Sequence, residues 1–170
     1  MRRLATVFLT LVLGGCGGGD PQETREPVAP PPTPAPATGS VTKGVTLSCG
    51  RSKVRVPDLP PNLERAGSFA RLPALARPLK VRGALWQDGA EQLRVGVVCG
   101  VRGAEQFATL VARSRLTAYR GKPALRWNSR GGLRNYMWLE RPGTAVYIAA
   151  TPALASQVRG IAAGIGRPAG

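Results

Sequence analysis

The sequence predicts an α+β domain, a largely antiparallel sheet with two helices packed on one face. Paired runs of alternating apolar residues, separated by turn signals, indicate β-hairpins. After each hairpin, apolar residues recur at helical spacing. The chain has 170 residues, 43% of them hydrophobic, which is enough for one ordinary domain and not for two. We place this domain at residues 44–170.

The first half of the domain is expected to begin with one or two short strands within residues 44–56. Residues 57–78 are rich in Pro, Leu and Arg, and we predict that they form mostly loop. A helix is predicted over residues 103–116, with Phe107, Leu110 and neighbouring apolar residues on one side.

A hairpin is predicted over residues 79–99, between the first strands and this helix. Asp88 and Gly89 mark its turn, because Asp-Gly is a preferred hairpin turn. A three-residue loop would place Leu85 opposite Leu93 on the core face. The apolar pattern therefore favours an odd-length loop with a bulge.

The second half repeats this order with a short strand at 122–128 and a hairpin that pairs 133–140 with 144–150. Pro142 followed by Gly143 suits a type II turn, which needs a positive φ at its third residue. The second half therefore predicts another hairpin of the same kind.

The last helix is expected to start after Thr151 as its N-cap, with Pro152 in the first turn, and to run to about Ile165. Its apolar residues are spaced by 4, 3 and 4 positions, as one face of a helix requires: Leu154, Val158, Ile161 and Ile165.

Two cysteines of the domain, Cys49 and Cys99, each end an apolar run and precede a glycine. Strand alternation places each sulfur on the apolar side of its strand. An even pair of cysteines favours a disulfide where a domain lies in an oxidising compartment, although two free core thiols are the alternative.

Polar and aromatic side chains are most concentrated at residues 126–138. If Met137 and Leu139 face the helices, the opposite face of the second hairpin carries Arg134, Tyr136, Trp138 and Tyr147. Aromatic rings edged by arginine could bind an anionic amphiphile or a glycan. The alternative is that other parts of the chain cover this face.

The charge of the chain is strongly basic, with 24 Lys and Arg against nine acids and a net charge of +15. Residues 44–170 hold 20 of these bases and six of the acids, so the charge belongs to the domain. Because the bases are scattered, we expect no nucleic acid as a partner. For a protein held at a cell membrane, the expected polyanions are anionic lipid headgroups or wall polymers.

Catalysis finds little support in the sequence. The chain has no His, no framed nucleophile and no obvious pair of carboxylates. No residue pattern indicates a metal or another cofactor. We therefore expect a protein that binds and does not catalyse.

The first residues combine a basic start, an apolar run and the sequence Leu13-Gly14-Gly15-Cys16. This pattern resembles the lipobox of bacterial lipoproteins. The resemblance implies that residues 1–15 are a cleaved signal peptide and that Cys16 carries the lipid. Residues 16–43 are rich in Pro and Gly and would form a disordered, extended tether.

The order of elements also resembles small extracytoplasmic α+β domains of uncharacterised bacterial lipoproteins. We therefore expect a lipid-anchored extracytoplasmic protein, attached to a cell membrane, that acts as a binding module at the cell envelope. The alternative is a carrier that holds a hydrophobic or amphiphilic ligand between sheet and helices.

Overall fold

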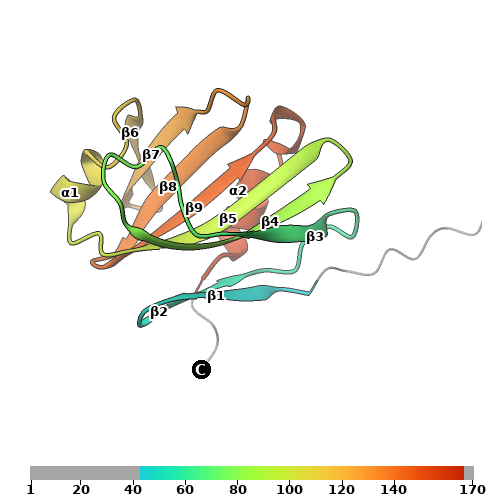
Figure 1. Ribbon diagram of the computed structural model, residues 1–170, viewed down its shortest axis with the longest axis horizontal. Helices are drawn as coiled ribbons and strands as arrows, with labels where there is room; N and C mark the ends of the chain where they lie inside the picture. The colour runs from blue at the N-terminus through green and yellow to red at the C-terminus, as the bar shows by residue number, and fades with distance from the viewer. Residues whose placement is uncertain (1–42, 167–170) are drawn as a thin grey trace, which may run out of the picture. The chain divides into compact units, whose positions relative to one another are not determined.

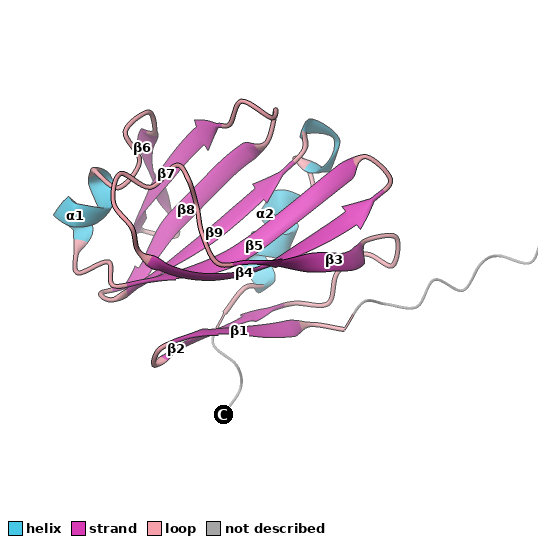
Figure 2. Ribbon diagram, in the orientation of Figure 1, coloured by secondary structure: helices cyan, strands magenta, loops and turns pink. Residues whose placement is uncertain are grey.

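The computed structural model describes residues 43–166. The predicted signal peptide, Cys16 and residues 16–42 of the tether lie outside this range. Strands are the main secondary structure of the described part (Figure 2). They are β1 (Val45–Cys49), β2 (Ser52–Val56), β3 (Glu64–Phe69), β4 (Lys80–Asp88), β5 (Glu91–Cys99), β6 (Arg115–Tyr119), β7 (Lys122–Asn128), β8 (Arg134–Arg141) and β9 (Thr144–Ala150). The helical segments are α1 (Ala104–Ala108), the 3-10 turn η1 (Pro152–Leu154) and α2 (Val158–Gly164).

Seven of these strands form one sheet in the order β3-β4-β5-β9-β8-β7-β6, and every neighbouring pair is antiparallel. Strands β1 and β2 form a separate hairpin that lies alongside this sheet (Figure 1). The prediction of a largely antiparallel sheet is confirmed. The two predicted hairpins are β4–β5 and β8–β9, and they meet where β5 pairs with β9.

Both faces of the sheet are buried, as β5 illustrates. Val97 belongs to a core that also contains Leu47 of β1 and Ile161 of α2. Its neighbour Val98 belongs to a second core, which contains Phe107 of α1. Side chains alternate between the two faces of a strand, so α1 and α2 cover opposite faces. The structure does not show the expected packing of both helices on one face.

The β4–β5 hairpin has a different register from the predicted one. Asp88 pairs with Glu91, and Leu85 lies opposite Arg94 instead of Leu93. The loop is thus two residues long, and Gly89 takes a φ of 56° at its first position, as a type II′ turn requires. The prediction failed because β5 is buried on both faces, so apolar alternation could not define the register.

Two strands were missed by the sequence analysis. Strand β3 lies in the segment predicted as loop, and β6 lies at the end of the predicted helix 103–116, of which α1 covers only a short part. Both are edge strands with few buried side chains, so they carry little apolar signal. Helix α1 ends early because the chain turns, and the Leu110 carbonyl accepts the Ala76 N–H at 2.8 Å.

The last predicted helix is broken into η1 and α2. Thr151 caps no helix with its side chain. Its hydroxyl instead accepts the Gln92 N–H at 3.1 Å and contacts Glu91. Leu154 and Ile161 are nevertheless buried in the core, as their spacing predicted.

The hairpin β1–β2 is joined to the main sheet by a covalent bond. Cys49 of β1 and Cys99 of β5 form a disulfide, with their Cα atoms 6.0 Å apart, so the predicted pair is present. Beside it, the hydroxyls of Ser52 and Thr144 share a buried hydrogen bond between β2 and β9. These two links hold the N-terminal hairpin against the sheet.

Candidate functional site

The predicted aromatic face is only partly formed. Arg134, Tyr136 and Trp138 alternate along β8 and share one face, whereas Tyr147 lies on the opposite face beside Met137. The cause is a register shift between Leu139 and Arg141, which leaves one extra residue in β8. Such a bulge moves the partner side chains to the other face of the sheet.

Two of the four predicted residues are core residues. Trp138 is 1% exposed and Tyr147 is 3% exposed. The Tyr147 hydroxyl donates to Asn135 Oδ1 at 2.7 Å, and burial raises the pKa of Tyr147 to about 12. Tyr136 is half-buried and Arg134 is exposed, so these two alone remain accessible to a ligand.

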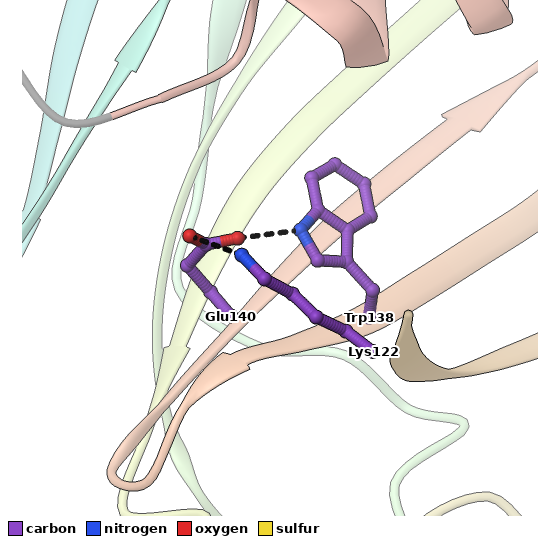
Figure 3. Close-up of polar contacts among 3 residues, drawn as sticks. All are labelled: Lys122, Trp138 and Glu140. Atoms are coloured by element: carbon purple, nitrogen blue, oxygen red, sulfur yellow. Dashed lines mark hydrogen bonds and ion pairs between the residues drawn. The ribbon is translucent and has the colours of Figure 1, made fainter. Parts of the chain in front are cut away.

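Glu140 lies on the same strand as this face, and both of its carboxylate oxygens already have partners. Figure 3 shows its two oxygens binding Lys122 and Trp138. Lys122 Nζ lies 2.7 Å from Oε1, and Trp138 Nε1 donates to Oε2 at 2.9 Å. Strands β6, β7 and β8 contain no other acidic residue. The remaining cations on these strands therefore have no acidic neighbour there.

A groove of about 430 Å³ opens on this side of the sheet, between β6–β8 and α2. It is lined by four arginines and no carboxylate. The lining residues are Thr117, Ala118, Tyr119, Arg120, Arg126, Arg134, Asn135, Tyr136, Ala155, Val158, Arg159 and Ala162. We call this the arginine groove.

The sheet positions the arginines close to one another. Arg126 of β7 lies opposite Tyr136 of β8, and Arg134 follows two residues away on the same face, as a diagonal neighbour. On the other side of Arg126, β6 presents Arg115 directly opposite. Within residues 43–166 the only ion pair is Lys122–Glu140, so these arginines are uncompensated.

Two tyrosines form the floor of the groove beside the arginines. Tyr119 and Tyr136 meet edge to face at 5.8 Å, and Tyr119 also contacts Trp138 at 4.8 Å. The Tyr119 hydroxyl is buried and has no hydrogen-bond partner among the described residues. Burial raises the pKa of Tyr136, against the opposing effect of the nearby Arg126 charge, so its phenol is neutral at pH 7.

The β6–β7 turn brings the fourth arginine into the groove. Tyr119 pairs with Lys122, which leaves Arg120 and Gly121 as a two-residue loop with φ values of 50° and 73°. Within residues 43–166, Arg120 is the only non-glycine residue with a positive φ. This conformation costs roughly 1 kcal/mol for such a residue. Its guanidinium lies 5.5 Å from the centre of the Tyr119 ring.

The opposite wall of the groove comes from the η1–α2 segment. Ala155, Val158 and Ala162 are apolar, and Arg159 adds a charge. The groove is therefore cationic on its sheet side and mainly apolar on its helix side.

The sequence analysis missed Tyr119, Arg120 and Arg159 as parts of this site. Arg126 was within the dense segment at 126–138 but was not assigned to the face. Strand β6 was not predicted: its first two residues fell at the end of the predicted helix 103–116, and the alternation of Arg115, Thr117 and Tyr119 was not recognised as a strand.

The charged side chains that line the groove are all arginines. Arginine stays protonated at any physiological pH and its planar guanidinium donates to oxyanions, but it is a poor proton-transfer group. No group of three or more His, Cys, Asp or Glu lies together in residues 43–166. No helix within that range is long and apolar enough to cross a membrane.

No protein-family model, curated protein or solved structure matches this chain.

Proposed function

We propose that this protein is a membrane-anchored extracytoplasmic lipoprotein that binds anionic groups of the cell envelope in its arginine groove. It acts by binding and not by catalysis. The observation that carries this proposal is the set of four arginines without a lining carboxylate. An oxyanion placed among them would offset their mutual repulsion and accept their hydrogen bonds.

The place of action follows from the first residues of the chain. The lipobox Leu13-Gly14-Gly15-Cys16 supports attachment of lipid at Cys16, and the following tether would keep the domain near the membrane. Anionic headgroups and wall polymers are the polyanions within its reach. Each arginine near such a surface adds about 1 kcal/mol of attraction, which salt screens.

The alternative function is a carrier of an amphiphilic ligand. One observation favours it: the groove lies between the sheet and α2, and Val158 and Ala162 supply an apolar wall there. A carrier would need the ligand to remain bound when the protein leaves the membrane surface. The two functions therefore differ in whether the ligand stays in the cell envelope or remains bound when the protein leaves it.

The test is binding to vesicles by the full chain with Cys16→Ser, which removes the lipid acceptor. We expect binding to phosphatidylglycerol vesicles, release in high salt and no binding to phosphatidylcholine. The Arg126→Gln/Arg134→Gln variant should bind at least about tenfold more weakly. Arg71 and Arg113 are exposed outside the groove, so Arg71→Gln/Arg113→Gln removes the same charge as a control. An equal loss in both variants would contradict a groove-specific site.

A further inference from the structure

We propose that the arginine groove holds one molecule of a phosphate-headed amphiphile. The phosphate would lie against Arg126, Arg134 and Arg159, and the apolar part would lie along Val158 and Ala162. This inference rests on the proposed anion-binding function and specifies its ligand.

The arginines approach the groove from different elements, and this arrangement favours a phosphate as the anionic group of the ligand. Arg126 lies on β7, Arg134 on β8 and Arg159 on α2, so their guanidinium groups reach the groove from the sheet and from the helix. A phosphate ester offers acceptor oxygens in a tetrahedral arrangement, which donors on several sides can share. A carboxylate offers two oxygens in one plane and suits a single guanidinium fork.

The apolar part is indicated by the wall opposite these charges. Ala155 and Val158 are only half-buried, although both line the groove, and the rings of Tyr119 and Tyr136 form its floor. A hydrocarbon or ring placed there would remove this surface from water. A purely ionic ligand would leave the helix side of the groove uncovered.

The size of the groove favours a single ligand. Its volume of about 430 Å³ lies within the range of small-molecule sites. The Tyr119 hydroxyl, buried without a partner among residues 43–166, would gain an acceptor from an oxygen of the ligand. Arg120, at the rim of the groove, has a strained backbone conformation with a positive φ. Such strain is concentrated at functional sites.

Titration calorimetry on the full chain with Cys16→Ser tests this inference with three soluble ligands at equal ionic strength. These are octyl phosphate below its micellar concentration, glycerol phosphate and octanoate. We expect octyl phosphate to bind at least about tenfold more tightly than glycerol phosphate, since burial of two methylene groups accounts for that factor. We expect it to bind more tightly than octanoate too, because the phosphate carries more charge and more acceptor oxygens for the arginines. Equal affinities for octyl phosphate and glycerol phosphate would overturn the apolar assignment. Equal affinities for octyl phosphate and octanoate would overturn the phosphate.

Two variants locate the ligand. Val158→Asp should reduce the advantage of octyl phosphate over glycerol phosphate, and Arg134→Gln should weaken both ligands. Arg113→Gln, outside the groove, should change neither affinity. If neither phosphate ligand binds, the proposed anion-binding function fails as well. If glycerol phosphate binds through Arg134 and the octyl chain adds nothing, only the amphiphile fails.

A competition experiment distinguishes the two sources of such a ligand. If octyl phosphate releases the chain from phosphatidylglycerol vesicles, the natural ligand is a membrane lipid headgroup. If octyl phosphate binds without releasing the chain, the ligand is a soluble phosphate ester. Both outcomes support the shared chemistry, whereas binding that persists in Arg126→Gln/Arg134→Gln would place the ligand elsewhere.

Discussion

Arg115 and Arg126 lie directly opposite each other across β6 and β7, and neither forms an ion pair within residues 43–166. Like charges in this position destabilise a sheet by about 0.2–1 kcal/mol. The one carboxylate on these strands, Glu140, is bound to Lys122 and Trp138 instead. The sheet thus retains an unfavourable pair beside the groove, as expected of a binding site that trades stability for function.

Replacing one member of this pair should raise stability. Arg126→Gln removes the repulsion, so we expect the free energy of unfolding to increase by up to about 1 kcal/mol at low ionic strength, and less at high salt. Urea unfolding at both salt concentrations measures this change. Arg113→Gln, with no opposing arginine, should leave stability nearly unchanged. A loss of stability in Arg126→Gln at both salt concentrations would indicate a structural role instead.

Replacing Arg120 should change stability and anion binding in opposite directions. Asn-Gly is the preferred sequence for a two-residue turn with two positive φ values, so Arg120→Asn should stabilise the domain by roughly 1 kcal/mol. The same change removes a guanidinium from the groove and should weaken binding to anionic vesicles. Thermal unfolding and vesicle sedimentation of one variant measure both effects. Unchanged vesicle binding would remove Arg120 from the site.

The disulfide Cys49–Cys99 should contribute most to the stability of the N-terminal hairpin. The two cysteines are 50 residues apart, and a crosslink over such a loop stabilises by roughly 4 kcal/mol on the chain-entropy model. We expect Cys49→Ala/Cys99→Ala to unfold at lower urea concentration. A reductant should shift the wild-type midpoint in the same direction and leave the variant unaffected. A variant as stable as the wild type would show that the bond is dispensable.

Tyr147 predicts a specific loss of stability in alkali. Its pKa is raised from an ordinary value of 10.0 to about 12, because burial disfavours the phenolate. The unfolded chain therefore releases this proton first, so stability is complete below pH 10 and falls as the pH rises toward about 12. Absorbance of tyrosinate should show a late step near pH 12, and Tyr147→Phe should lose that step. A wild-type titration complete near pH 10 would contradict the burial of this hydroxyl.

The sequence was most informative where local chemistry is decisive. Pro142-Gly143 predicted a type II turn, and Gly143 has the required positive φ of 87°. The alternation around Cys49 and Cys99 placed both sulfurs toward one core, where they form the disulfide. The turn type and the direction in which each sulfur points depend on residues close together in the chain, so one sequence is enough to predict them.

The parts that the sequence could not predict depend on tertiary contacts. The bulge at Glu140 moves Tyr147 away from Trp138, and nothing in the β8 sequence distinguishes that register from a regular one. Strand β3 has little apolar signal of its own. It is fixed by Phe69, whose ring lies over Gly83, where a β carbon would come within 2.1 Å of Cζ. The arginine groove was missed for the same reason, because its residues come from β6, β7, β8 and the η1–α2 segment.

Thermal unfolding in rising phosphate at constant ionic strength measures whether the arginine groove binds anions. A ligand that binds only the folded state raises the midpoint in proportion to RT ln(1 + [L]/Kd). We predict that phosphate raises the midpoint of the wild type and of Arg71→Gln/Arg113→Gln by several degrees relative to chloride. Arg126→Gln/Arg134→Gln should keep only the smaller rise that phosphate causes in any folded protein through its exclusion from the surface. An equal rise in all three proteins would show that phosphate does not act through the groove.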